Sequence, residues 1–324
     1  MSKILITGAA GFIGSHLAER CVELGYRVKC FIRYNSRNHW GWLENSAYKN
    51  DLEIVQGDVR DYDSVTQAMK GCQAVFHLAA LIGIPYSYVS PLAYVKTNVE
   101  GAYNILQAAR ELDLENILMT STSETYGTAQ YIPIDENHPM VGQSPYSATK
   151  IAADQLAISY HRSFHLPIRI VRPFNTYGPR QSARAIIPAI VCQILQGQRS
   201  IKLGNVHPTR DLTYVKDTVN GFIEIYQSDK FHGEIVNIGT DEEISIRELV
   251  KLIAKIMNTE VSILTEPARV RPERSEVERL KCNNTKILTG TKWRPQSSLE
   301  KGLSETIAWL KEHFQDYKPD IYNV

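Results

Sequence analysis

The sequence predicts an α/β protein: a doubly wound parallel sheet with a smaller C-terminal lobe. Short, nearly unbroken apolar segments alternate with longer segments of helical periodicity through the first half of the chain. Strands with such continuous apolar runs belong to a parallel sheet that helices cover on both faces. The length of 324 residues suits one large domain or two lobes that share a cleft.

The individual elements follow from periodicity and from the residues that end each segment. The predicted strands are residues 3–7, 26–34, 51–58, 74–80, 116–123 and 168–175. The predicted helices are residues 15–25, 61–71, 91–112 and 146–164. From about residue 173 the alternation loosens, and proline, arginine and short helices become frequent. We therefore expect residues 1–172 to form the main domain and residues 173–324 mainly the lobe, with residues 210–240 returning to the sheet.

The composition excludes several classes of function. The net charge of +1 provides no overall field that would attract nucleic acid or an anionic membrane, and no apolar run approaches the length of a membrane span. The N-terminus lacks the apolar region of a signal peptide. The five cysteines are scattered without metal-ligand spacing. We expect reduced thiols, a cytoplasmic protein and no metal site.

The stretch TGAAGFIG places Gly8, Gly11 and Gly14 between the first strand and the first helix. Glycines at this spacing allow a tight turn and bring a pyrophosphate against a helix N-terminus. A tight strand–helix turn without a ligand is the simpler alternative. The context of strand, glycine loop and helix is the one that a Rossmann dinucleotide site requires, so we predict bound NAD(P).

The end of the second strand bears on the choice between NAD and NADP. An NAD site usually has an acid there, which binds the ribose 2′-hydroxyl. This chain has none, and Arg33 is placed to hold a 2′-phosphate instead. The pattern favours NADP, although an exposed arginine is an equally simple interpretation. Asp58, at the end of the third strand, is a candidate adenine contact or a turn residue.

Tyr146 and Lys150 form a YxxxK pattern on one face of a predicted helix, and Thr122 follows the preceding strand. A nearby ammonium and the positive ring of a cofactor would lower the tyrosine pKa and make the phenol a base for an alcohol. Together with TGAAGFIG, the pattern predicts a redox site.

Seven stretches resemble the extended short-chain dehydrogenase/reductase family. They are TGAAGFIG, HLAA, TNVEG, STSETYG, YSATK, RPFNTYGPR and RDLTYVKD. The resemblance implies a nucleotide-sugar substrate and a catalytic triad of Thr122, Tyr146 and Lys150. It also implies a homodimer formed through a four-helix bundle by the helices that begin near Leu92 and at Tyr146. The cofactor contacts it implies are Gly8, Gly11, Phe12, Ile13, Gly14, Arg33, Asp58, Val59, Leu78, Ala79, Ala80, Tyr146, Lys150 and Pro173.

Glu124 separates the reactions that this family catalyses. A 4-epimerase needs only the triad, whereas a 4,6-dehydratase needs a base for the C5 proton, which becomes acidic once C4 is a ketone. In an extended strand end, Thr122 and Glu124 would point to the same side. Ser123 stands where dehydratases of dTDP-glucose have an aspartate, and the GDP-mannose 4,6-dehydratases also read STSE. We therefore predict a 4,6-dehydratase in which Ser123 orients the C6 hydroxyl and Glu124 serves as base and then as acid.

Three alternatives stay open. They are a 4-epimerase with a structural Glu124, a UDP-glucuronate decarboxylase, whose family members also read STSE, and a non-catalytic dinucleotide sensor. The stretches RYNSRNHWGWLE and SPYSATKIAADQLAISYHRSF look closest to dehydratases of legionaminic-type pathways, which act on N-acetylglucosamine nucleotides. The substrate would thus be UDP- or GDP-N-acetylglucosamine, a precursor of surface glycans.

The resemblance also implies contacts with the substrate. Arg210 and Arg271 match diphosphate-binding arginines, whose fork fits phosphate oxygens, although each could instead form a surface ion pair. The full set of predicted substrate contacts is Ser87, Asn175, Arg184, Arg210, Arg271 and Glu276.

Overall fold

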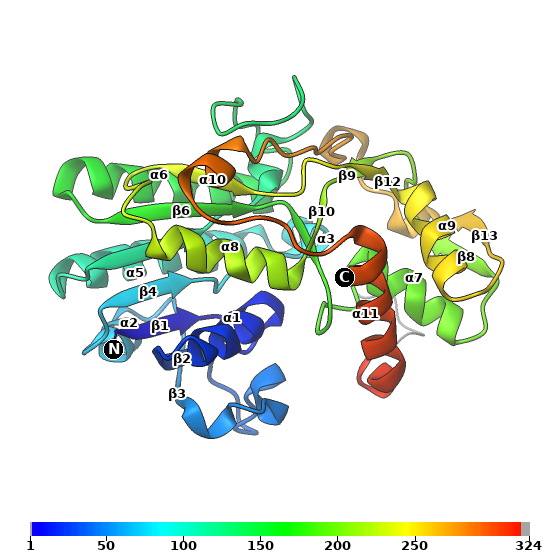
Figure 1. Cartoon of the computed structure of the whole chain (residues 1–324). Helices are drawn as coiled ribbons and strands as arrows, with labels where there is room; N and C mark the ends of the chain where they lie inside the picture. Colours follow the sequence, from blue (N-terminus) through cyan, green and yellow to red (C-terminus); the bar gives the residue numbers. More distant parts are fainter. Residues whose placement is uncertain (1, 319–324) are drawn as a thin grey trace.

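A seven-stranded parallel sheet forms the centre of the protein, in a computed structural model that describes residues 2–318 (Figure 1). The strand order is β11-β6-β5-β4-β1-β2-β3, and every neighbouring pair is parallel. The strands are β1 Lys3–Thr7, β2 Arg27–Arg33, β3 Leu52–Gly57, β4 Ala74–His77, β5 Asn116–Thr120, β6 Ile168–Pro173 and β11 Ile235–Ile238. The order reverses direction between β1 and β4, which is the switch point where ligands bind in sheets of this kind. The predicted fold class is confirmed.

Helices cover both faces of this sheet (Figure 1). One face carries α1 Phe12–Glu23 and α8 Val215–Gln227, and the other carries α2 Tyr62–Met69, α5 Gly101–Glu111 and α6 Pro145–Phe164. The start of α2 is stabilised by the Asp61 carboxylate, which accepts from two backbone N–H groups. Ser144 and Ser147 cap α6 reciprocally, and this fixes the turn that carries Tyr146.

The remaining elements build the smaller lobe around three short strand pairs. The pairs are β7 Asn175–Tyr177 with β10 Leu212–Tyr214, β8 Ser200–Leu203 with β13 Ser262–Thr265, and β9 Thr209–Arg210 with β12 Ile244–Ser245. The lobe's helices are α7 Ile186–Leu195, α9 Ile246–Ile256, α10 Thr285–Gly290 and α11 Leu299–Glu312. Short 3₁₀ turns lie at Gly41–Asn45, Lys49–Asp51, Ser123–Tyr126, Pro267–Arg269, Glu273–Ser275 and Phe314–Asp316.

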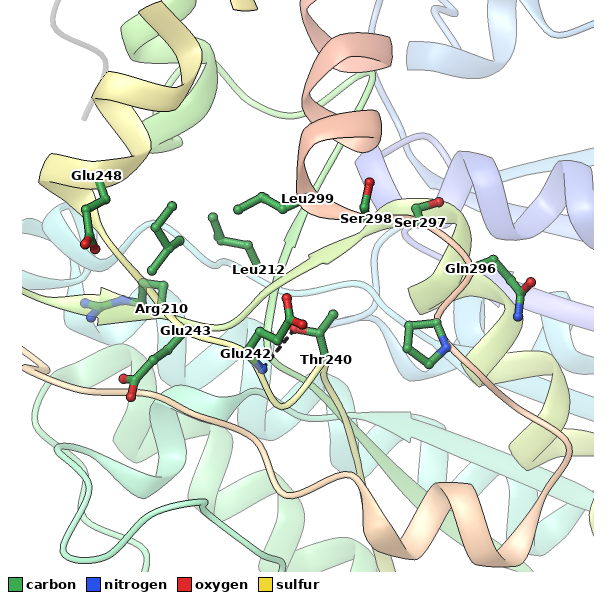
Figure 2. Close-up of a pocket in the computed structure, with 12 residues that line it drawn as sticks. Arg210, Leu212, Thr240, Glu242, Glu243, Glu248, Gln296, Ser297, Ser298 and Leu299 are labelled. Carbon is green, nitrogen blue, oxygen red and sulfur yellow. Dashed lines mark hydrogen bonds between the residues drawn. The ribbon is translucent and has the colours of Figure 1, made fainter. Parts of the chain in front are cut away.

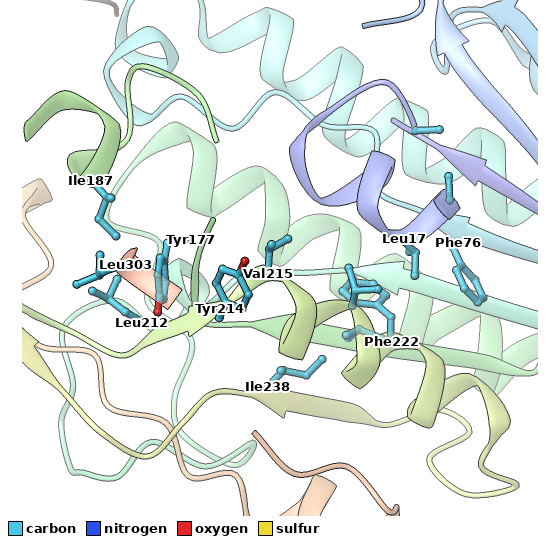
Figure 3. Packing of buried hydrophobic residues seen from close by; sticks show 14 of the residues in the cluster. Leu17, Phe76, Tyr177, Ile187, Leu212, Tyr214, Val215, Phe222, Ile238 and Leu303 are labelled. Atoms are coloured by element: carbon cyan, nitrogen blue, oxygen red, sulfur yellow. The ribbon is translucent and has the colours of Figure 1, made fainter. Parts of the chain in front are cut away.

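One apolar core runs from the sheet into the lobe. Figure 3 shows it passing from Leu17 and Phe76, through Phe222 and Ile238, to Tyr214. β11 pairs with β6 although it follows β10 of the lobe in sequence, so the chain returns to the sheet after residue 210. The division at residues 172 and 173 stays a prediction, because both parts share this core.

Three boundaries differ from those predicted. α1 begins at Phe12 because the extended backbone of Gly11 already opens the helix. β4 ends at His77 because the next two N–H groups turn to Thr7. The helix predicted for residues 91–112 consists of α4 Pro91–Tyr94, a π-helical stretch Val95–Glu100 and α5, and α3 Ile84–Val89 precedes it. No helix within residues 2–318 is long and apolar enough to cross a membrane.

Candidate active site

The glycine loop forms a close-packed cradle at the N-terminus of α1. Gly8 has a positive φ of 70°, and a Cβ there would lie 2.8 Å from the backbone nitrogen of Ala79. A Cβ on Gly14 would lie 2.2 Å from the carbonyl oxygen of Gly8. The first turn of α1 has no side-chain cap and no acid, so its N–H groups are free to donate hydrogen bonds to an anion. The cradle, with Phe12 and Ile13 in the first turn, therefore fits a dinucleotide pyrophosphate.

The backbone after β4 is held against this cradle by Thr7. The Thr7 hydroxyl accepts from the N–H groups of Leu78 and Ala79 and lies 2.8 Å from His77 Nδ1. Burial lowers the pKa of His77 to about 3, so this ring is neutral. His77 is thus a hydrogen-bonded core residue, and the segment from Leu78 to Ala80 borders the cradle.

The ends of β2 and β3 bring Arg33 and Asp58 close together. Arg33 is exposed and lies opposite Gly57 in the strand register. The Arg60 guanidinium, 2.5 Å from the Asp58 carboxylate, lowers the pKa of that carboxyl, and Arg33 adds to the effect. Val59 is buried, and its carbonyl accepts from Asn104. Asp58 is therefore already paired with Arg60, and Arg33 remains exposed.

Glu124 lies in a 3₁₀ turn and not in an extended strand end. Thr122 is extended, but its hydroxyl accepts from the Glu124 N–H and starts the turn Ser123–Tyr126. The predicted strand alternation was therefore wrong, because a capping hydroxyl ends the strand. Ser123 is buried, whereas Glu124 is partly accessible. The Glu124 carboxylate raises the pKa of Tyr146 and opposes the lowering of the Arg210 pKa, so it lies in the neighbourhood of both residues.

Tyr146 and Lys150 are both buried in the first two turns of α6. Burial raises the pKa of Tyr146, a hydrogen bond with Thr122 lowers it, and the Glu124 charge raises it further. The prediction that the lysine lowers this pKa is not met in the protein alone. The Lys150 ammonium donates instead to the Thr120 carbonyl, at 2.6 Å. Desolvation of the phenol and the neighbouring Glu124 charge therefore outweigh the hydrogen bond with Thr122.

Sequence reasoning missed a buried ion pair directly behind these residues. Arg172 donates to Asp154 at 2.6 Å, and both side chains are fully or almost fully buried. Asp154 follows Lys150 by one helical turn, and Arg172 is a charged residue inside an otherwise apolar strand. These two departures from the apolar pattern are the signals that could have revealed the pair.

Two predicted diphosphate ligands share one carboxylate. Glu276 Oε1 lies 3.4 Å from Arg210 Nη2 and 3.6 Å from Arg271 Nη1. Burial lowers the pKa of Arg210, and Glu124 and Glu276 oppose that shift. Arg271 Nη1 is buried without a hydrogen-bond partner. The structure thus gathers two guanidinium groups at one point, and one of them has an unused donor.

The other predicted substrate residues lie in different surroundings. Pro173 ends β6, and Asn175, two residues on, has a buried Oδ1 without a hydrogen-bond partner. Ser87 is fully buried, and its hydroxyl donates to the Ile84 carbonyl at 2.6 Å. Arg184 is exposed and its guanidinium lies against Gly83. Asn175 is therefore available to a ligand, while the Ser87 hydroxyl already has a partner.

A cavity of about 600 Å³ opens beside Arg210, between β10, the loop after β11 and the start of α11 (Figure 2). Glu242, Glu243 and Glu248 line it, and Glu243 is held by Arg279 and Thr209. Arg210 is the predicted site residue among those drawn in Figure 2. The cavity therefore adjoins Arg210, and its lining does not include Glu124 or Tyr146. Within residues 2–318 no group of histidine, cysteine, aspartate and glutamate has the arrangement of a metal site.

Comparison with known proteins identifies the family. Residues 5–306 match the profile of the GDP-mannose 4,6-dehydratase family. The chain belongs to this family. The resemblance to nucleotide-sugar enzymes of the extended short-chain dehydrogenase/reductase type is thereby confirmed, and so is the prediction of a nicotinamide-dependent hydro-lyase class.

Similar members of the wider group carry different activities in their names. The chain is 31% identical over 319 residues to a putative UDP-glucose 4-epimerase of Methanocaldococcus jannaschii, covering 96% of this chain and 99% of the relative. It is 32% identical over 323 residues to a UDP-N-acetyl-α-D-glucosaminuronate decarboxylase of Bacillus cytotoxicus, covering 96% and 98%. A solved dTDP-glucose 4,6-dehydratase of Streptomyces venezuelae, with NAD bound, has a TM-score of 0.89 and 28% identity, covering 98% and 99%. Membership of the dehydratase family therefore does not by itself name the reaction.

Proposed function

We propose that this protein is a nucleotide-sugar 4,6-dehydratase. The observation that carries the proposal is the place of Glu124, a partly accessible carboxylate two residues after Thr122 and near enough to Tyr146 and Arg210 to influence the pKa of both. Simple epimerisation at C4 has no use for a carboxylate beside the redox tyrosine. Elimination of water across C5 and C6 requires one.

The residues divide the reaction among them. Tyr146 removes the proton of the C4 hydroxyl, with Thr122 hydrogen-bonded to its phenol and Lys150 one turn along the same helix. NAD(P), when bound in the glycine cradle, supplies a hydride acceptor and later the hydride donor. Glu124 takes the C5 proton, made acidic by the C4 ketone, and then protonates the departing C6 hydroxyl, which Ser123 orients. The hydride taken from C4 would then be returned to C6, and Glu124, protonated again by solvent, would add a proton at C5. The product is a 4-keto-6-deoxy sugar nucleotide.

Arg210, Arg271 and Asn175 would hold the substrate diphosphate and sugar. Arg271 Nη1 and Asn175 Oδ1 support this role, since both are buried without a hydrogen-bond partner and such groups are uncommon. Glu276 then positions both arginines and remains free to accept from a ribose hydroxyl. For the sugar we propose an N-acetylglucosamine carried on UDP or GDP, on the similarity of residues 33–44 and 144–164 to legionaminic-type dehydratases.

For the cofactor we propose a preference for NADP over NAD. The exposed Arg33 supports it, because the neighbouring Asp58 is paired with Arg60. The solved Streptomyces enzyme holds NAD, so its cofactor does not support this preference.

We also propose a cytoplasmic homodimer. The five cysteines are free and buried, which fits a reducing compartment. Val89, Leu92, Val95 and Tyr103 expose 45–73% of their surface along the edge formed by α3, α4 and α5. An exposed apolar stripe on consecutive helical turns is typical of a helical interface.

The proposal is tested by mass spectrometry in heavy water. The purified protein is offered UDP-N-acetylglucosamine, GDP-N-acetylglucosamine, GDP-mannose, dTDP-glucose and UDP-glucuronate separately. Loss of one water with one solvent deuterium at C5 supports dehydration and identifies the substrate. An unchanged mass with inverted C4 would show an epimerase, and loss of carbon dioxide a decarboxylase. Glu124→Gln should stop the reaction after oxidation, with the nicotinamide left reduced, whereas an epimerase should be little affected.

A further inference from the structure

We propose that Ser121, Asp154 and Arg172 form a buried positioning triad that holds the three segments of the redox site in register. The inference rests on the proposed roles of Tyr146 and Lys150. Asp154 Oδ2 accepts from the Ser121 hydroxyl and from Arg172 Nη2, both at 2.6 Å, and Arg172 Nε lies 3.2 Å from the Ser121 oxygen. The three side chains therefore close a ring of hydrogen bonds.

Each member of the positioning triad lies beside a residue of the site. Ser121 precedes Thr122 at the end of β5, Arg172 precedes Pro173 at the end of β6, and Asp154 follows Lys150 by one turn of α6. Two strands and one helix are thus joined behind the positions where their side chains enter the site. A displacement of one segment would break bonds to both others.

Lys150 is held by a separate bond beside the ring. Its ammonium donates to the Thr120 carbonyl, the residue before Ser121, while Asp154 accepts from Ser121 itself. Two parallel bonds therefore connect one turn of α6 to two consecutive residues of β5. This arrangement fixes the direction of the lysine stem as well as the place of its charge.

Of the charged groups around Lys150, Asp154 is the one that stabilises the protonated ammonium. Burial lowers the pKa of Lys150, Asp154 raises it and Arg172 lowers it again. From β4, His77 faces the lysine but is neutral, because burial lowers its pKa to about 3. Tyr146, on the same helix, also feels the Asp154 charge, which raises its pKa. Asp154 is therefore the anion that keeps the lysine protonated beside Arg172.

Stability alone does not account for this ion pair. The desolvation of two buried charges largely offsets their attraction, so apolar side chains could replace such a pair without loss of stability. Arg172 also packs over the Tyr126 ring at 4.5 Å, and Tyr126 donates to Asn237 on β11. The ring is therefore connected through Tyr126 to β11, the strand next to β6, behind the site.

The test is a double-mutant cycle on the affinity for NADH, measured by its fluorescence on binding. Lys150→Met should weaken binding about tenfold, and Asp154→Asn should weaken it by a similar factor. If Asp154 acts through Lys150, the double variant should bind no more weakly than Lys150→Met. The affinity of Asp154→Asn should also begin to fall at a lower pH than that of the wild type, because its lysine loses the proton earlier.

Ser121→Ala is a milder variant for the case that Asp154→Asn fails to fold, because it removes one hydrogen bond and keeps the ion pair. It should weaken NADH binding, and Ser121→Thr, which keeps the hydroxyl, should restore the affinity. Arg169→Met is the matched control: Arg169 is a buried arginine on β6, bonded to Asn116 and to two carbonyls at the opposite end of the strand. It should lower the melting temperature without changing the affinity. Additive losses in the cycle would overturn the positioning role. An unchanged affinity of Lys150→Met would instead overturn the proposed role of Lys150, and the inference with it.

Discussion

Replacing Arg210 by methionine tests the diphosphate end of the site without breaking the fold. The Arg210 side chain is about nine-tenths buried and donates to the Thr209 carbonyl and to Glu276. Removal of one partner of a buried ion pair is normally costly because the other charge is left uncompensated. Here Glu276 keeps Arg271 at 3.6 Å, so no carboxylate is stranded. The loss should therefore fall on ligand binding.

The size of this loss follows from the contacts. A hydrogen bond to a charged group contributes about 1.5–3 kcal/mol, and a guanidinium can offer two to a phosphate. Arg271 remains and takes over part of the charge. We therefore expect a net loss of about 2–3 kcal/mol, or about 30- to 150-fold in Kd. Arg210→Lys should recover only part of it, because an ammonium lacks the planar fork.

Calorimetric titration with UDP, GDP and dTDP measures the effect directly. Arg279→Met provides the control, because Arg279 lies opposite Thr209, next to Arg210, and is about half exposed, paired with Glu243. It should leave the affinity unchanged within about twofold. A folded Arg210→Met variant that binds its nucleotide as tightly as the wild type would refute the assignment of Arg210 to the diphosphate. An equal loss in both variants would point to a general electrostatic effect.

Three further outcomes are expected. Arg33→Ser should weaken NADPH binding about tenfold and NADH binding little, and an unchanged ratio in fluorescence titrations would contradict the NADP preference. Leu92→Asp should shift the mass found by light scattering from dimer to monomer, while Leu264→Asp, exposed to a similar degree on β13, should leave it unchanged. His77 links stability to pH, because its folded pKa of about 3 lies below the ordinary 6.5. The unfolded chain binds the extra proton between these values, so stability should fall as the pH drops from 6.5 towards 3, by up to about 1.4 kcal/mol per pH unit. His77→Asn, which can still bond to Thr7, should flatten this part of the melting-temperature profile, and an unchanged slope would refute the assignment.

Local patterns were sufficient for most of the fold. The glycines of TGAAGFIG lie where strand, turn and helix require them, and Gly8 adopts the positive φ that a side chain would resist. The capping serine of α6 and the apolar strands are likewise readable from neighbours in sequence. Helix boundaries were less exact, as at residues 95–100, where the π-helical stretch depends on packing that the periodicity does not encode.

The sequence by itself determined the class of fold and the family, and it supplied the residue types of the proposed site, because these depend on spacing within single elements. Only the tertiary structure decided how those residues act on one another. Glu124 and Arg210 are far apart in sequence, yet the end of β5 and the lobe bring them near enough for the Glu124 charge to act on the Arg210 pKa. The direction of the Tyr146 pKa shift also depends on burial, which is a property of the packed molecule. Asp154 and Arg172 could be recognised as partners only in the folded protein, where α6 lies against β6. A charged residue inside an apolar segment does not by itself indicate which residue of opposite charge it will contact.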